Sequence, residues 1–315
     1  MNKPEAVRCK FPLPDLGGGG IVGGMDERLR DEMDRVVRGA LAEDVGSGDA
    51  TTLATVSADC LAEGDIVARE PLVVSGLEVA VRVFGEVSGR LECECLVGDG
   101  AAVASGDVVM RVRGPAGALL TGERTALNLL QQLSGVASLT RRYVEAVEGT
   151  GVRVLDTRKT VPGLRWLQKQ AVRHGGGTNH RVGLFDAILI KDNHLAALAE
   201  FDAGAVGEAV RRARERFPGL LVEVEADRLD QVLAAVEAGA DVVLLDNMSL
   251  ETLRDAVKLT AGRIRTEASG GVDLTTVRDI ALTGVDAISV GALTHSARAM
   301  DLALDLRLSG LRGEP

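Results

Sequence analysis

The chain has 315 residues, of which 46% are hydrophobic and 26% charged, and its formal net charge is −10 at pH 7. This length suggests about two domains and excludes a peptide or a small disulfide-stapled scaffold. The sequence lacks the ~18-residue apolar run of a membrane-spanning helix and the clustered basic residues of a nucleic-acid surface. We therefore expect a small-molecule partner, no nucleic acid and no membrane.

The first residues and the cysteine content bear on where the protein works. Residues 1–24 contain three prolines and a run of four glycines but no apolar core of a signal peptide, so we expect a disordered tail. The four cysteines are too few and too scattered for a disulfide framework in a chain of this length. These features favour a cytoplasmic location.

Residues 25–133 are expected to form an N-terminal α+β domain. Apolar residues recur at helical spacing over residues 25–42, and short valine-rich strands alternate with glycine turns over residues 66–114. A second helical pattern then runs to residue 133 and places Arg124 and Asn128 one turn apart on its polar side. This helix would lead into the next domain.

The second half repeats a pattern of strand and helix. Short apolar segments alternate with amphipathic ones, which is typical of parallel strands connected by helices. The expected strands are residues 152–155, 187–190, 220–224, 242–245, 264–266 and 287–290. We expect an α/β barrel over residues 134–293 and a C-terminal helix over residues 294–315. An open doubly wound sheet is the alternative, because six strands do not prove closure.

Polar residues and glycines follow these strands, where barrel enzymes place their active sites. They are Asp156, Arg158, Lys159, Lys191, His194, Glu223, Glu225, Asp246, Asn247, Ser269, Gly270, Gly271 and Gly291. Three of the cations at this rim, together with the nearby Arg181, stand out in an otherwise acidic chain and favour a polyanionic ligand. A set of surface ion pairs is the alternative, and it is the better explanation for any one of these side chains alone.

Two further features fit a phosphorylated ligand. Glu225 and Asp246 end adjacent strands, and their carboxylates suit a divalent cation held partly by phosphate oxygens, with pairing to the rim cations as the alternative. Ser269, Gly270 and Gly291 lie in late barrel loops, where backbone amides can approach a phosphate. The chain has neither a dinucleotide-binding glycine pattern nor a Walker-type motif, which disfavours nicotinamide-dinucleotide and ATP-hydrolysing functions.

An ordered set of motifs resembles the quinolinate phosphoribosyltransferase family, the carboxylating nicotinate-nucleotide pyrophosphorylases. The motifs of the second half are DTRKTVPGLR (156–165), GGGTNHR (175–181), IKDNH (190–194), VEVE (222–225), LDNM (245–248), ASGG (268–271) and VGALTH (290–295). Those of the first half are EDVGSGDATT (43–52) and GERTALN (122–128). The resemblance covers the chain from about Leu29 to about Arg307.

The resemblance implies an α/β fold in which an N-terminal α/β sandwich domain is followed by an incomplete α/β barrel. It implies a homodimer, open to further assembly, in which each subunit completes its neighbour's active site with Arg124. The implied reaction transfers phosphoribosyl from phosphoribosyl pyrophosphate to quinolinate with decarboxylation. Its products are nicotinate mononucleotide, pyrophosphate and CO₂, in the biosynthesis of NAD, and the implied cofactor is Mg²⁺.

The resemblance also assigns the site residues. Lys159, Glu225 and Asp246 are the implied catalytic residues, and the two carboxylates are the implied Mg²⁺ ligands. The residues that would surround the carboxylates of quinolinate are Arg158, His180, Arg181 and Lys191. The other implied substrate-binding residues are Arg124, Thr157, Ser269, Gly270, Gly271, Val290, Gly291 and Ala292.

The implied chemistry needs little acid–base catalysis in its first stage. The pyridine nitrogen of quinolinate loses no proton when it attacks the anomeric carbon, so the enzyme mainly positions and neutralises its substrates. After CO₂ leaves, C2 of the ring needs a proton, and the sequence does not identify the donor. Residues 168–170 (QKQ) depart from the aromatic-containing triplet that is more usual in the family, which puts the local packing in question.

Three other functions compete with this one. A related phosphoribosyltransferase-like protein of molybdenum utilisation shares the fold and several glycines, but the intact motifs NHR (179–181) and KDNH (191–194) favour quinolinate. A Schiff-base barrel aldolase would use Lys159 or Lys191 as its nucleophile if burial lowered the pKa of that lysine. A non-enzymatic small-molecule sensor is the third, because a fold alone does not establish catalysis.

Overall fold

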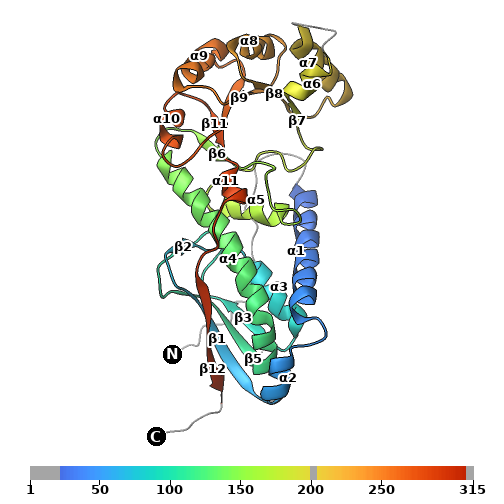
Figure 1. Cartoon of the computed structure of the whole chain (residues 1–315), viewed down its shortest axis with the longest axis vertical. Coiled ribbons are helices and arrows are strands. Elements are labelled where there is room, and N and C mark those ends of the chain that lie inside the picture. Colours follow the sequence, from blue (N-terminus) through green and yellow to red (C-terminus); the bar gives the residue numbers. More distant parts are fainter. Residues whose placement is uncertain (1–21, 199–203, 310–315) are drawn as a thin grey trace. The chain divides into compact units, whose positions relative to one another are not determined.

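The computed structural model describes residues 22–198 and 204–309. It divides into two compact units: unit 1 extends to Ala137 and resumes at Arg298, and unit 2 comprises Ser138–Ala297. Helix α4 (Ala116–Ala146) runs from unit 1 into unit 2 (Figure 1). Of the expected tail, residues 1–21 lie outside the described residues, and residues 22–24 begin helix α1. Within the described residues, no helix is long and apolar enough to cross a membrane.

Unit 1 contains a four-stranded antiparallel sheet and a two-stranded pair. Its elements besides α4 are α1 (Val22–Val45), α2 (Ala50–Thr55), β1 (Leu61–Ala68), β2 (Leu72–Val73), α3 (Leu77–Val87), β3 (Glu92–Cys95), β4 (Ala102–Val103), β5 (Val108–Pro115) and β12 (Leu302–Ser309). The larger sheet has the order β12-β1-β5-β3, and β2 pairs with β4. Ile66 of β1, Phe84 of α3 and Leu130 of α4 are fully buried in its core.

Helix α3 was not expected, because the valine-rich segment of residues 66–114 predicted strands and turns. The buried residues of α3 are spaced by three and four positions, at Leu77, Ala80 and Phe84, so one face of the helix packs into the core. Tertiary packing of this face overrides the β-preference of the valines between them. The prediction is therefore wrong for residues 77–87.

The expected C-terminal helix over residues 294–315 is also wrong. The described part contains only a short helix, α11 (Ala292–His295), followed by strand β12. Leucines at 302, 304, 306 and 308 alternate with other residues, and this period of two suits a strand rather than a helix. The strand pairs antiparallel with β1, from Leu61 opposite Ser309 to Ala68 opposite Leu302.

Unit 2 contains all six strands that the sequence predicted. They are β6 (Arg153–Leu155), β7 (Ile188–Ile190), β8 (Val222–Ala226), β9 (Val242–Asp246), β10 (Arg265–Ser269) and β11 (Ala287–Ser289). The helices of unit 2 after α4 are α5 (Arg165–His174), α6 (Asp192–Ala196), α7 (Ala205–Arg216), α8 (Leu229–Glu237), α9 (Leu250–Thr260), α10 (Val277–Ala281) and α11. Figure 1 shows α7, α8 and α9 on the outside of the strands.

The strand order decides between a barrel and an open sheet. All neighbours are parallel, and the order β6-β11-β10-β9-β8-β7 pairs the first strand of the unit with the last. In an open doubly wound sheet, the first strand of the unit would not pair with the last. Among the described residues no ladder joins β6 to β7, and Leu155 of β6 instead forms a single parallel bridge to Thr178, in the segment between α5 and β7. The incomplete α/β barrel is confirmed, and the doubly wound alternative is rejected.

Candidate active site

A cavity of about 580 Å³, called the rim cavity below, opens at the carboxyl ends of the barrel strands. It brings together eleven of the predicted site residues, namely Thr157, Arg158, Lys159, His180, Arg181, Lys191, Glu225, Asp246, Ser269, Gly270 and Gly271. These residues come from six different strand ends and loops. Convergence at the carboxyl edge is what parallel strands in a ring produce.

The rim cavity contains positive charge beyond its one ion pair, because Arg158, Lys159 and Arg181 form no ion pair with the described residues. Four cations line it, and Nε of Arg158 is buried without a hydrogen-bond partner among the described residues. Burial, and next the charge of Arg158, lowers the pKa of Arg181. A guanidinium group whose charged form is destabilised by burial and by a neighbouring guanidinium favours an anionic ligand beside it.

The ion-pair alternative holds for one of the four cations. Nζ of Lys191 donates a hydrogen bond to Oε2 of Glu225, and the two side chains are 43% and 16% exposed. On the neighbouring strand, Asp246 accepts a hydrogen bond of 2.7 Å from Nδ2 of Asn247. Both carboxylates still line the rim cavity, at the ends of β8 and β9.

Two glycines lie close to side chains around the cavity, and at Gly270 the backbone requires glycine. Gly270 has a φ of 93°, and a Cβ there would collide with the side-chain oxygen of Asn247. A Cβ at Gly291 would lie 3.1 Å from Cδ of Lys159, so this glycine lets the backbone approach the lysine stem. Larger residues at either position would displace a side chain of the cavity.

Four predicted residues do not line the rim cavity. Gly291 and Ala292 lie at the start of α11, where Gly291 approaches the side chain of Lys159. Val290 is buried, and its N–H donates a hydrogen bond to the carbonyl of Leu155. Arg124 belongs to unit 1, where it is exposed on α4. The structure of the single chain therefore gives Arg124 no part in the cavity.

Asp156 organises the floor of the site, a role that the sequence did not reveal. It is fully buried and accepts hydrogen bonds from Nδ2 of Asn179 at 2.6 Å and from the backbone N–H of His180 at 2.9 Å. It also accepts one from Nζ of Lys169, which in turn donates to the carbonyl of His180 at 3.1 Å. Asp156 and Lys169 thereby fix the loop that carries His180 and Arg181.

This network also explains the unusual triplet at residues 168–170. Gln168 is fully buried, donates to the carbonyl of Thr294 at 3.0 Å and accepts from the N–H of Val161 at 2.9 Å. Lys169 is 1% exposed and pairs with Asp156. Gln168 and Lys169 are therefore satisfied parts of the barrel interior and not packing defects, while Gln170 is half-buried and its Nε2 lies 3.0 Å from Nε2 of His174.

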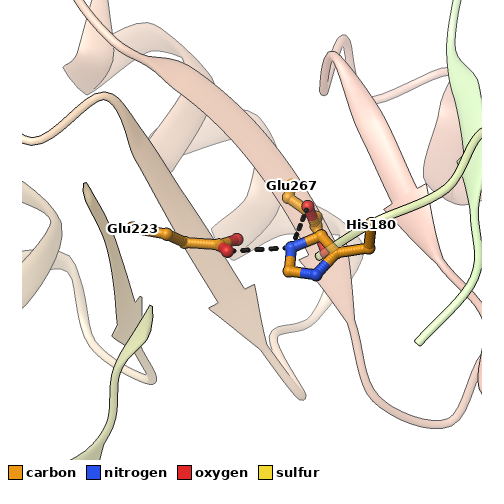
Figure 2. A group of neighbouring side chains, drawn as sticks. All are labelled: His180, Glu223 and Glu267. Atoms are coloured by element: carbon orange, nitrogen blue, oxygen red, sulfur yellow. Dashed lines mark hydrogen bonds and ion pairs between the residues drawn. The ribbon is translucent and has the colours of Figure 1, made fainter. Parts of the chain in front are cut away.

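A second buried group, called the buried triad below, consists of His180, Glu223 and Glu267. Nε2 of His180 lies 2.8 Å from Oε2 of Glu223 and 3.5 Å from Oε2 of Glu267 (Figure 2). Glu223 lies on β8 and Glu267 on β10, one layer below the rim. The three ligand atoms are also within 4.8 Å of one another, close enough for a metal ion. The alternating glutamates of VEVE (222–225) were the available sequence signal, because they share one face of the strand.

The lysines of the aldolase alternative lack the burial that it requires. Lys159 is exposed, and Lys191 is ion-paired and 43% exposed. The buried lysine of this barrel is Lys169, whose Nζ is engaged by Asp156 and the carbonyl of His180. A Schiff-base nucleophile must be desolvated and free to react, so none of the three suits that mechanism.

Comparison with known proteins agrees with this geometry. Residues 136–305 match the family profile of the quinolinate phosphoribosyl transferase C-terminal domain, and residues 49–134 match that of its N-terminal domain. The chain is 46% identical over 276 residues to the nicotinate-nucleotide pyrophosphorylase [carboxylating] of Mycobacterium leprae, covering 86% of this chain and 95% of that one. It is 41% identical over 268 residues to a probable enzyme of the same name from Bacillus subtilis, covering 85% and 91%.

Solved structures show the same relationship. The chain is similar to the nicotinate-nucleotide pyrophosphorylase of Francisella tularensis, with a TM-score of 0.83, 39% identity and coverage of 88% of this chain and 96% of that one. The two matched profiles together extend over both units of the structure, and the motifs that line the rim cavity lie within them. The chain belongs to the quinolinate phosphoribosyltransferase family.

Proposed function

We propose that this chain transfers the phosphoribosyl group of phosphoribosyl pyrophosphate to quinolinate and decarboxylates the product to nicotinate mononucleotide, a precursor of NAD. The observation that carries the proposal is the rim cavity, where four cations converge on one space and Arg158 has a buried, unpartnered Nε. Both substrates are polyanions, and a site of this kind stabilises them by charge. The named relatives carry out the same reaction according to their names.

The dicarboxylate is assigned to one side of the cavity. Arg158, Arg181 and Lys191 supply the positive charge, and His180 supplies a ring that the buried triad keeps oriented. Such fixed donors hold the pyridine ring so that its nitrogen faces the anomeric carbon of the sugar. Because this nitrogen carries no proton to lose, no general base is needed for the first stage.

Phosphoribosyl pyrophosphate is assigned to the other side, with Lys159 near the leaving pyrophosphate and the loop of Ser269 to Gly271 near phosphate. Gly291 lies against the stem of Lys159 and would help to position it. The donor set of Glu225 and Asp246 fits Mg²⁺, because both offer carboxylate oxygens at adjacent strand ends and leave positions for phosphate oxygens and water. Bound there, Mg²⁺ would supply charge neutralisation for the pyrophosphate. The carboxylates would also favour the positive charge that develops on the sugar.

The working form is proposed to be a homodimer in which Arg124 of one subunit enters the rim cavity of its partner. The exposed position of Arg124 on α4, outside the lining of that cavity, is consistent with a role between subunits. A cytoplasmic location is proposed from the small number and scattered positions of the cysteines.

Product analysis tests the proposed activity directly. The purified protein, incubated with quinolinate, phosphoribosyl pyrophosphate and Mg²⁺, should form nicotinate mononucleotide, pyrophosphate and CO₂ in equal amounts. Absence of these products would reject the proposal in favour of the molybdenum-related protein or a sensor. Borohydride trapping with carbonyl substrates should leave the lysines unmodified, and an adduct at Lys159 or Lys191 would support the aldolase instead.

Replacing Lys191 with alanine is expected to lower kcat/KM for quinolinate by about 10- to 100-fold, the effect of losing one charged hydrogen bond of ~1.5–3 kcal/mol. The melting temperature should change little, since the side chain is 43% exposed. Steady-state kinetics and thermal melts on the same preparation measure both. Lys258→Ala, at an exposed ion pair on α9, is the matched control and should behave like wild type. Wild-type kinetics in Lys191→Ala would remove it from the quinolinate site.

Replacing Glu225 with glutamine, or Asp246 with asparagine, is expected to raise the Mg²⁺ concentration for half-maximal activity by roughly tenfold, or ~1.4 kcal/mol. Each change keeps the shape of the side chain and removes one charged oxygen ligand. Mg²⁺ titration at saturating substrates measures the effect. Asp227→Asn is the control, because its carboxylate is 67% exposed and pairs with Arg228. Unchanged titrations in both variants would place the metal elsewhere.

A further inference from the structure

The buried triad separates two cavities of the barrel. His180 and Glu267 line the rim cavity, and together with Glu223 they also line a second cavity of about 160 Å³, called the lower cavity below. The lower cavity is lined by residues of the opposite, amino-terminal ends of the strands, including the exposed Arg153 and Arg265. His180 and Glu267 therefore have the substrate side above them and a separate, solvent-reaching side below.

Glu267 holds its proton more readily than an ordinary glutamate does. Burial, and next the charge of Glu223, raises the pKa of Glu267 to about 7, and the side chain is 3% exposed. Burial alone would lower the pKa of His180, but the hydrogen bond to Glu223 and the charge of Glu267 outweigh it and raise that pKa. Oε1 of each glutamate is buried without a hydrogen-bond partner among the described residues. A proton on Glu267 relieves the repulsion between the two carboxylates.

The orientation of the imidazole suits proton transfer through the ring. Nε2 faces the two carboxyl groups, at 2.8 Å from Glu223 and 3.5 Å from Glu267. Figure 2 shows the other ring nitrogen, Nδ1, on the side of the ring away from both. A neutral imidazole that carries its proton on Nδ1 can release that proton there while it takes one up at Nε2, since its two nitrogens are distinct sites on one ring.

We propose that Glu267 and His180 form a proton relay from the lower cavity to C2 of the pyridine ring, an inference that rests on the proposed function. The bond between C2 and its carboxylate breaks, CO₂ leaves, and the electron pair stays on C2, stabilised by the adjacent quaternary nitrogen. C2 takes the proton from Nδ1 of the neutral His180 ring, and Nε2 takes one from the protonated carboxyl group of Glu267. The ring is then neutral with its proton on Nε2, and Glu267 is a carboxylate. Glu267 regains its proton from water in the lower cavity, and His180 returns to the Nδ1–H form by exchanging one proton with water, so the net reaction consumes one solvent proton. Glu267 is a positioning and relay residue, because it acts through His180.

Single-turnover kinetics of Glu267→Gln test the relay. Glutamine keeps the size of the side chain but cannot supply the proton, so formation of nicotinate mononucleotide should slow by roughly 10²-fold, a typical general-acid effect. Pyrophosphate release precedes decarboxylation and should stay within about 2-fold of wild type by the same reasoning. The dicarboxylate mononucleotide should accumulate between the two events. In wild type both products should appear together, and a wild type without either product would reject the proposed function rather than the relay.

Two further variants complete the experiment. Glu267→Asp keeps the acid but shortens a side chain that already lies 3.5 Å from Nε2, so it should also show a lag. Glu237→Gln, the same change at an exposed position of α8, should show none. The relay would be overturned if pyrophosphate and nicotinate mononucleotide appeared together in Glu267→Gln. This holds whether both appear at the wild-type rate or both are slowed equally. If Glu267→Gln does not fold, the simultaneous appearance of the two products in Glu267→Asp would overturn the relay instead.

Discussion

Replacing Lys169 with methionine is expected to destabilise unit 2 by about 3–5 kcal/mol, the cost of leaving one partner of a buried ion pair alone. Asp156 is fully buried, and without Lys169 it keeps only the hydrogen bonds from Asn179 and from the N–H of His180. Burial already raises the pKa of Asp156 and lowers that of Lys169 against their mutual attraction. The pair is therefore costly to form and more costly to break.

Urea unfolding followed by the fluorescence of Trp166 measures this effect. Trp166 is the single tryptophan of the chain and lies on α5, three residues before Lys169, so it reports on unit 2. An unpaired buried carboxyl has a raised pKa in the folded state. The free energy of unfolding of a protein with such a group falls as the pH rises through that pKa. The deficit of Lys169→Met should therefore be larger at pH 8 than at pH 5.

The double variant Asp156→Asn, Lys169→Met is the control for this prediction. It removes both charges, and replacing a whole buried pair by neutral residues is far less costly than breaking it. Asparagine still offers an oxygen to the N–H of His180. The double variant should recover most of the stability lost in Lys169→Met and should remove its pH dependence. Equal destabilisation in the single and double variants would contradict the role given to the ion pair.

The barrel could be predicted from sequence because its strands and rim follow simple rules. Each strand is a short apolar run, and the residues after it must meet at one edge when the strands are parallel. Lys159, Lys191 and Asp246 were predicted at the rim on this ground, and the structure places all three in the rim cavity. The pairing of β6 with β11, which closes the ring apart from one seam, is a long-range contact that no local pattern encodes.

The polar interior of the barrel is the part that sequence reasoning missed. Asp156, Lys169 and Glu267 lie inside the unit with exposures of 3% or less, where a parallel sheet is expected to be apolar. Their hydrogen-bond partners come from distant segments, so nothing nearby in the sequence marks them as paired. Strand β12 was missed for a different reason, because its alternating leucines were assigned to a helix although their period is two.

Mixing two inactive variants is expected to restore activity if Arg124 acts across the subunit interface. An Arg124→Ala subunit and a Lys159→Ala subunit form mixed dimers in which both lesions fall in one composite site and the other site is wholly native. Random re-pairing should give about a quarter of the wild-type specific activity, because half of the dimers are mixed and each has one native site. Arg124 is exposed on α4, so its loss should cost at most ~0.5 kcal/mol of stability.

The opposite arrangement of the same two lesions gives the decisive control. When a subunit that carries both Arg124→Ala and Lys159→Ala pairs with a wild-type subunit, each composite site contains one lesion, so these mixed dimers should be inactive. If Arg124 served its own subunit instead, the wild-type half would stay active and the first mixture would recover nothing. Subunit exchange is confirmed by mass spectrometry before each assay. Recovery in the first mixture and loss in the second can both occur only when the two residues act in the same site from different chains.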